Sequence, residues 1–139
     1  MNALVEKATR LLEERYMEPY HTAASVIVAK DGTEYVGINI DHFSGYLCAE
    51  TSALASAIND GQAEFDTIVA VGKNLHNGFD IVNPCGKCRQ LLHDFAPDVK
   101  VIVKEGDEVM TLDINRLLPY GFKRRQEKIR RARRGEKVV

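Results

Sequence analysis

The chain has 139 residues, of which 45% are hydrophobic and 28% charged, with a formal net charge of −1. These values are typical of a single globular domain, and no apolar run reaches the about 18 residues of a membrane span. The first residues lack the apolar segment of a signal peptide, and three cysteines cannot close into disulfide pairs alone. We therefore expect a cytoplasmic protein with no membrane partner.

The first half of the chain predicts a helix, a hairpin and a second helix. Apolar residues recur at helical spacing before Pro19, a β-branched run precedes the turn Asp31-Gly32, and an Ala- and Leu-rich stretch ends near Gly61. The expected elements are a helix over 4–17, strands over 24–29 and 34–40, and a helix over 48–58.

The second half predicts a strand, a helix and another strand. A continuous apolar strand is followed by a polar loop, and a helix closed by Pro97 leads to the next strand. The expected elements are a strand over 67–72, a loop over 73–83, a helix over 85–95, a strand over 99–103 and a short helix over 112–118. A hairpin combined with a parallel crossover predicts an α/β fold in which helices cover a mixed sheet.

The C-terminal segment 123–139 holds nine Lys or Arg and two Glu, a local charge of +7. We expect a folded domain over 1–122 and a basic tail or helix over 123–139. One interpretation is a solvated terminal helix, and another is a tether for nucleic acid. The chain has no Trp to serve as a stacking platform, so we do not expect a nucleic-acid partner, although the tail leaves this open.

The three cysteines fall into two groups, Cys48-Ala49-Glu50 and Pro84-Cys85-Gly86-Lys87-Cys88. Both groups lie at predicted helix starts, where the partial positive charge favours the thiolate, the form that binds metals. Three thiolates without a fourth ligand leave a zinc ion with an open position, which is typical of catalytic zinc. A Cys-x-x-Cys pair also occurs in redox sites, and a structural zinc site would need one of the four histidines.

Glu50 follows Cys48 by two residues, so in a first helical turn it can face the open side of the metal. Zinc lowers the pKa of bound water toward about 7, and a carboxylate beside it can carry protons. Hydroxide on such a metal can add to an electron-poor ring carbon of a substrate that carries an amine. We predict that Glu50 takes the proton of the attacking water, delivers it to the ring nitrogen of that substrate and then helps to protonate the leaving amine. The alternative is an acid that only complements the helix dipole.

The two cysteine groups, together with Gly37-Ile38-Asn39 and Arg89-Gln90, resemble the cytidine deaminase superfamily, specifically its small nucleoside branch. The resemblance implies a three-layer helix–sheet–helix sandwich with a mixed five-stranded sheet. It also implies a homotetramer with active sites near subunit contacts. Carried over residue by residue, it makes Cys48, Cys85 and Cys88 the zinc ligands and Glu50 the proton shuttle.

The same resemblance assigns substrate contacts. Asn39 matches an asparagine that binds the sugar hydroxyl, and the backbone around Ala49 and Pro84 would frame the base. Asp41 stands where many cytidine deaminases have a glutamate that grips the ribose. Phe122 matches an aromatic residue near the C-terminus of blasticidin S deaminase, a member of this branch.

Further positions depart from the relatives. Phe79 stands where blasticidin S deaminase has an arginine that suits its substrate's carboxylate. Thr51 replaces the arginine that often offsets the thiolate charge, so we expect Lys87, Arg89 or Gln90 to do this.

We predict a zinc-dependent hydrolase of pyrimidine salvage that deaminates cytidine or deoxycytidine to the uridine form and releases ammonia. The alternatives are deamination of blasticidin S or another modified aminopyrimidine nucleoside, deamination of a polymer, and a non-enzymatic zinc-binding module with a basic partner-binding tail.

Overall fold

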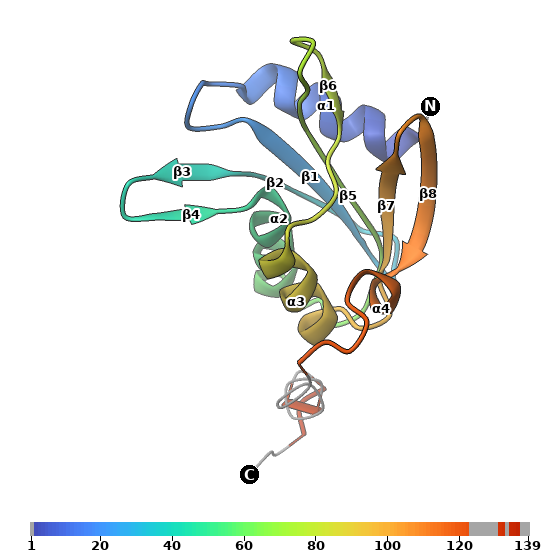
Figure 1. The fold of residues 1–139 in the computed structure, drawn as a ribbon. Coiled ribbons are helices and arrows are strands. Elements are labelled where there is room, and N and C mark those ends of the chain that lie inside the picture. The colour runs from blue at the N-terminus through green and yellow to red at the C-terminus, as the bar shows by residue number, and fades with distance from the viewer. Residues whose placement is uncertain (1, 123–130, 133, 137–139) are drawn as a thin grey trace.

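The protein is an α/β sandwich in a computed structural model that describes residues 2–122, 131, 132 and 134–136 (Figure 1). Its helices are α1 (Ala3–Arg15), α2 (Ala49–Asn59), α3 (Gly86–Phe95) and α4 (Ile114–Leu117). Its strands are β1 (Ala23–Ala29), β2 (Glu34–Ile38), β3 (Ile40–His42), β4 (Gly45–Leu47), β5 (Phe65–Lys73), β6 (Phe79–Ile81), β7 (Lys100–Glu105) and β8 (Glu108–Asp113). Within the described residues, no helix has the length and apolar character needed to span a bilayer.

The main sheet is mixed, as predicted. Its continuous path is β2-β1-β5-β7-β8, in which β5 and β7 are parallel and the other neighbours are antiparallel. The predicted five strands correspond in number to this path. A sixth strand, β6, pairs with the end of β5 in the segment that we predicted as a polar loop. Three residues are too short for a periodic pattern to mark them, so only the pairing with Val71–Lys73 defines this strand.

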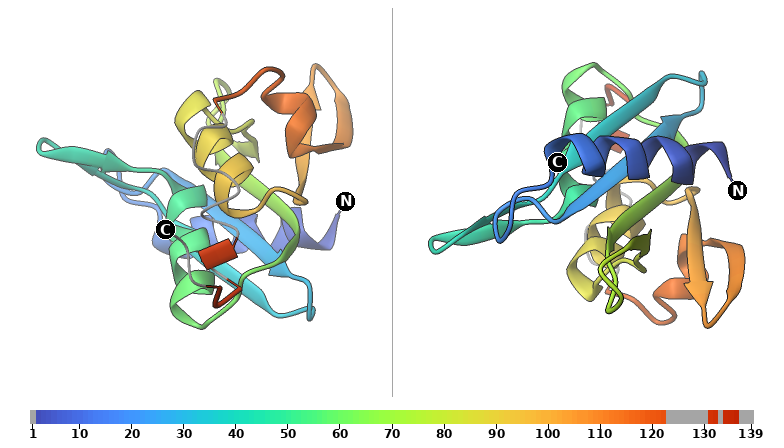
Figure 2. Two further views of the ribbon diagram at one scale, coloured as in Figure 1. Left: turned by 90° about the horizontal axis from the view of Figure 1, so that it is seen from below. Right: turned by 90° about the horizontal axis from the view of Figure 1, so that it is seen from above.

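Helices cover both faces of the sheet. One face carries α1, whose buried residues Val5, Ala8 and Leu12 share a core with β1 and β5. The other face carries α2, α3 and α4 over a second core that contains Leu54, Leu92 and other apolar residues. The two views in Figure 2 show α1 across one side of the strands, with α2 and α3 on the opposite side. The predicted three-layer sandwich is therefore confirmed.

Two predicted boundaries are wrong. The strand predicted over 34–40 ends at Ile38, and a separate hairpin of β3 and β4 follows the buried Asn39. This hairpin projects from the body of the protein (Figure 1). The helix predicted over 112–118 begins only at Ile114, because the preceding residues form β8, an edge strand that alternates too weakly to be recognised.

Gly37 brings β2 and α2 into direct contact. A Cβ atom built on Gly37 would lie 2.3 Å from the backbone nitrogen of Ala53 and 2.7 Å from the carbonyl carbon of Ser52. Only glycine allows this approach of strand and helix backbones. Since α2 begins at Ala49, next to Cys48, the contact fixes the helix that presents the first cysteine group.

Candidate metal centre and active site

The three cysteines meet at the N-termini of two helices. Cys48 is the N-cap of α2, Cys85 is the N-cap of α3, and Cys88 lies in the first turn of α3. Their sulfur atoms all lie within 4.8 Å of one another, with 3.8 Å between the sulfurs of Cys48 and Cys85. Thiolates at about 2.3 Å from a tetrahedral zinc lie about 3.8 Å apart. The cluster therefore has dimensions that fit Zn²⁺.

The sulfurs differ in their surroundings. Cys88 is buried, Cys48 is half-buried and Cys85 is exposed. Burial raises the pKa of Cys48 and Cys88, and the negative charge of Glu50 adds to this effect on both. Burial also raises the pKa of Cys85. Hydrogen bonds that include the backbone N–H groups of Cys88 and Lys87 outweigh this effect, so the pKa of Cys85 is lowered. A bound cation would offset this accumulation of negative charge.

Glu50 lies in the first turn of α2 and is 92% shielded from solvent, with 8% exposure. Together with Ala70, Pro84 and Leu92 it lines a narrow, mostly apolar cavity. Burial raises the pKa of its carboxyl group above the ordinary value. A carboxyl group in such surroundings exchanges protons closer to neutral pH than an exposed one, which suits proton transfer.

No histidine joins the cysteine cluster among the residues that the structure describes. His21 Nδ1 lies 2.9 Å from the carbonyl oxygen of Asn39, and His93 is buried with its Nδ1 3.5 Å from Asp94. His42 contacts Ser44 in the hairpin. The cluster thus offers three protein ligands, which leaves the fourth tetrahedral position for water or substrate.

Two of the side chains that we expected to offset the charge of the thiolates, Arg89 and Gln90, bind elsewhere. The Arg89 side chain donates to the carbonyl oxygens of Pro84 and Leu117, at 2.8 and 3.1 Å. Gln90 donates to the carbonyl oxygen of Phe122 at 2.9 Å. Arg89 and Gln90 therefore tie the start of α3 to the segment after α4 rather than offsetting the thiolate charge, and Lys87 is exposed.

The predicted sugar contacts lie at the base of the projecting hairpin. Asn39 is fully buried, and its side-chain oxygen Oδ1 accepts hydrogen bonds from the backbone N–H groups of Thr22 and Ala23. Its amide nitrogen donates to the hydroxyl group of Tyr46 at 3.0 Å. Asp41 is exposed and pairs directly opposite Tyr46 in the hairpin register, so both side chains point to one face.

Tyr46 is a residue that sequence reasoning missed. Burial raises its pKa, the negative charges of Cys48, Asp41 and Glu50 raise it further, and the hydrogen bond with Asn39 acts in the opposite direction. The signal available in the sequence was the turn Ser44-Gly45, which aligns Tyr46 with Asp41 across a hairpin.

The remaining predicted positions differ in their surroundings. Ala49 is buried at the start of α2, between Cys48 and Glu50. Phe122 is 66% exposed, and its backbone carbonyl accepts the bond from Gln90. Phe79 packs against Tyr16 in the core on the α1 face, with ring centroids 5.4 Å apart. Phe79 is therefore part of this core.

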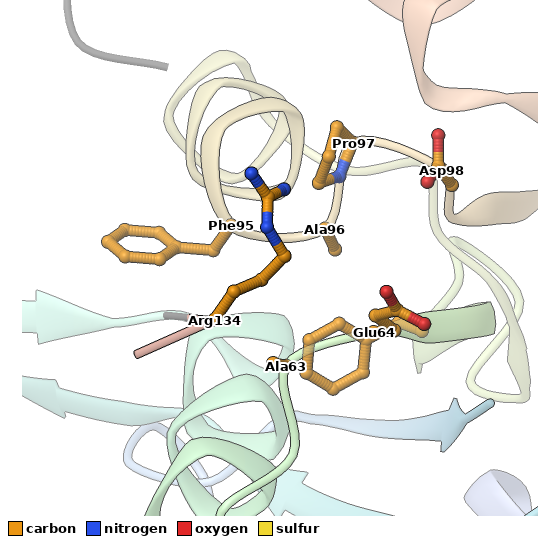
Figure 3. A pocket seen from close by; sticks show the side chains of 8 residues that line it. Ala63, Glu64, Phe95, Ala96, Pro97, Asp98 and Arg134 are labelled. Carbon is orange, nitrogen blue, oxygen red and sulfur yellow. The ribbon is translucent and has the colours of Figure 1, made fainter. Parts of the chain in front are cut away.

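A second pocket lies at the opposite end of α3 from the cysteines (Figure 3). Its lining includes Phe95, Pro97, Asp98 and Glu64, and the side chain of Arg134 extends across it from the C-terminal segment. The α3 helix of 10 residues separates this pocket from the cysteine cluster by about 15 Å. The pocket contains none of the three sulfurs and is not part of the candidate active site.

The mixed sheet and the three sulfurs at two helix N-termini define an α/β protein with a zinc-binding cysteine cluster. A model of the cytidine and deoxycytidylate deaminase zinc-binding region matches residues 1–105. This match covers most of the chain and both cysteine groups. The protein therefore belongs to the cytidine and deoxycytidylate deaminase family.

Individual relatives agree with this assignment. The blasticidin-S deaminase of Bacillus cereus is 35% identical over 127 residues, which cover 87% of this chain and 91% of the relative. A cytidine deaminase of Halalkalibacterium halodurans is 32% identical over 126 residues, covering 86% and 91%. The crystal structure of a cytidine deaminase from Burkholderia pseudomallei matches with a TM-score of 0.71 at 29% identity, covering 88% of this chain and 100% of the other.

Proposed function

We propose that this protein is a zinc-dependent hydrolase that deaminates cytidine and deoxycytidine to the corresponding uridine nucleosides and releases ammonia. The observation that carries the proposal is the preformed set of three sulfurs within 4.8 Å, with the buried carboxyl group of Glu50 beside it. Among the described residues no fourth ligand closes the set. A closed structural zinc site would need one.

In this proposal Cys48, Cys85 and Cys88 hold the zinc ion. When bound, zinc makes water nucleophilic near neutral pH. Glu50 accepts a proton from the attacking water and delivers it to the ring nitrogen of the base. It then takes the second proton from the hydroxyl group that has added to the ring carbon and passes it to the departing amine, so that one water is consumed and one ammonia leaves. The burial of Glu50, which raises its pKa, supports both halves of this proton transfer.

We also propose that Asn39, Asp41, Ala49 and Phe122 contact the nucleoside. Asn39 and Asp41 would receive the sugar, and the backbone at Ala49 would frame the base. Support comes from the position of Asn39 and Asp41 at the base of the hairpin, where both neighbour Tyr46.

A second candidate is deamination of blasticidin S. The observation in its favour is the 35% identity to the Bacillus cereus blasticidin-S deaminase, compared with 32% to the Halalkalibacterium cytidine deaminase. The zinc site and Glu50 would serve the same chemistry, so only the substrate contacts distinguish the two candidates.

An ammonia-release screen of zinc-loaded protein separates the candidates. The panel contains cytidine, deoxycytidine, cytosine and blasticidin S. We expect the highest kcat/KM with cytidine or deoxycytidine. Turnover of blasticidin S alone would establish the second candidate. One zinc per chain without ammonia release from any of these compounds would contradict the enzyme proposal and favour a zinc-binding module.

We further propose a homotetramer in the cytoplasm, acting in pyrimidine salvage. The projecting hairpin exposes apolar side chains, with Ile40 47% and Phe43 97% accessible, as expected of a surface that another subunit covers. Three cysteines that serve as metal ligands and form no disulfide fit a reducing compartment. Light scattering of the zinc-loaded protein tests the assembly, and a monomer at micromolar concentration would contradict it.

We also propose that residues 1–122 form the deaminase domain, without help from the basic tail. Most of the tail, 123–130, 133 and 137–139, lies outside the described residues. A chain truncated after Phe122 retains the carbonyl that Gln90 binds. We expect it to deaminate cytidine as the full chain does. A loss of activity, or tail-dependent and salt-sensitive activity on RNA or DNA, would contradict this proposal.

A further inference from the structure

The first turn of α2 places a hydroxyl group against the most buried sulfur. Thr51 Oγ1 lies 3.8 Å from the sulfur of Cys88, which is within hydrogen-bonding reach for sulfur. Thr51 is half-buried and Cys88 is 1% exposed, so solvent has little access between them. A thiolate only accepts hydrogen bonds, so the hydroxyl group is the donor when Cys88 is ionised.

Cys88 is the sulfur with the greatest need for a donor. Its side chain is buried, so water cannot stabilise the charge of its thiolate. Cys85 is more exposed and receives backbone N–H groups of α3, whereas Cys88 lies one turn further into the helix. The side chains of Arg89 and Gln90, which we expected to offset the thiolate charge, bind backbone carbonyls instead.

We propose that Thr51 is a positioning residue of the metal centre, which donates a hydrogen bond to the Cys88 thiolate in place of a cationic side chain. This inference rests on the proposed zinc ligands. The hydrogen bond stabilises the thiolate and fixes its direction toward the metal. Partners of metal ligands of this kind typically change metal affinity by about 10- to 100-fold when removed.

The alternative role for the Thr51 hydroxyl group is a hydrogen bond within its own helix. Threonine hydroxyls in helices also donate to the carbonyl one turn earlier, without any contact to a ligand. Thr9 in α1 is such a case, because its hydroxyl group donates to the carbonyl oxygen of Val5 at 2.8 Å. Thr9→Val therefore serves as a matched control for the loss of a helical threonine hydroxyl.

The test uses full-length Thr51→Val, which keeps the shape of the side chain, and Thr51→Ser, which keeps the hydroxyl group. Zinc affinity is measured by competition with a chromophoric chelator, and Co²⁺-loaded samples give the sulfur-to-metal charge-transfer band. For Thr51→Val we expect a zinc Kd at least about tenfold higher and a charge-transfer band at lower energy, because the sulfur loses a donor. Thr51→Ser and Thr9→Val should remain close to wild type.

A Thr51→Val protein with the zinc Kd and the charge-transfer band of wild type would overturn the role of Thr51 while leaving the zinc site intact. A wild-type protein that binds neither zinc nor cobalt would overturn the proposed metal centre itself. Thr51→Ala provides the same comparison if the valine variant does not fold. The circular dichroism of each metal-free variant shows whether the fold is retained.

Discussion

The amide nitrogen of Asn39 donates a hydrogen bond to the hydroxyl group of Tyr46 over 3.0 Å, while the carbonyl oxygen of the same side chain accepts two backbone N–H groups. These contacts fix the orientation of the amide, with its oxygen toward the start of β1 and its nitrogen toward the hairpin. Tyr46 thus connects the predicted sugar contact to β4, the strand that leads directly to Cys48.

Replacing Tyr46 with Phe should weaken substrate binding more than folding. The change removes the acceptor that holds the Asn39 amide, so we expect the KM for cytidine to rise about fivefold, roughly 1 kcal/mol, with a smaller effect on kcat. Steady-state kinetics measure this. Tyr20→Phe is the control, because Tyr20 is also about half exposed. An unchanged KM in Tyr46→Phe would show that the Tyr46 hydroxyl group does not organise the site.

Replacing Asn39 with Ala should destabilise the fold. The backbone N–H groups of Thr22 and Ala23 would lose their acceptor in a buried environment, which costs about 1–3 kcal/mol for each group. Urea unfolding of the zinc-free protein measures the loss. Asn115→Ala, at an exposed position, should change the free energy of unfolding by less than about 0.5 kcal/mol. Equal stability of the two variants would contradict the anchoring role of Asn39.

Replacing Gly37 with Ala should displace α2. The added methyl group would overlap the backbone of Ala53 and Ser52, and neither can move without the helix. We expect a loss of about 1–3 kcal/mol in stability and weaker zinc binding, because α2 carries Cys48. Thermal unfolding and zinc titration measure the two effects. Gly78→Ala is the control, since its nearest neighbour would lie at 3.4 Å, and a Gly37→Ala protein as stable as this control would contradict the account.

The ion pair between Asp80 and Lys104 should make the stability depend on pH. Lys104 Nζ lies 2.5 Å from Asp80 Oδ2 and lowers the pKa of that carboxyl group. A lowered pKa in the folded state gives stability that is present above the unfolded pKa of about 3.9 and is lost as the pH falls below it. Because the pair is partly exposed, we expect Asp80→Asn to cost about 1 kcal/mol or less at pH 7 and still less near pH 3.

Urea unfolding of wild type and Asp80→Asn at both pH values measures this difference. Lys100→Met is a control for a more exposed pair, since Lys100 and Asp113 are each more than half exposed. A cost of Asp80→Asn that is the same at pH 7 and pH 3 would contradict an electrostatic role. The pair matters for the site because Asn83, which also binds the backbone of Lys104, leads directly to Pro84 and Cys85.

The sequence predicted the metal cluster better than the substrate contacts, for a physical reason. The helix starts and the Cys-x-x-Cys spacing place Cys85 and Cys88 together locally, and the resemblance of the two cysteine groups to a zinc deaminase signature added Cys48 before any tertiary structure was known. The partners of long side chains depend on tertiary packing. Arg89 donates to a backbone carbonyl oxygen and Phe79 packs against Tyr16, and the local sequence pattern indicated neither contact.

In the fold, too, local sequence pattern predicted some elements well and missed those that depend on tertiary packing. The long periodic elements, α1, β1, α2, β5 and α3, were predicted close to their observed bounds. The hairpin of β3 and β4, the short β6 and the edge strand β8 were missed, because pairing rather than burial defines them. Tyr46 lies in one of these missed strands, which is why the sequence did not place it beside Asn39.

The most direct test of the proposed function is the ammonia release of zinc-loaded Glu50→Gln with cytidine. The control is Glu6→Gln, because Glu6 is likewise an acid in the first turn of a helix. We predict one zinc per chain in both variants, at least about a 100-fold loss of kcat in Glu50→Gln, and wild-type activity in Glu6→Gln. Wild-type ammonia release from zinc-loaded Glu50→Gln would contradict the proton-transfer role of Glu50 and the mechanism built on it.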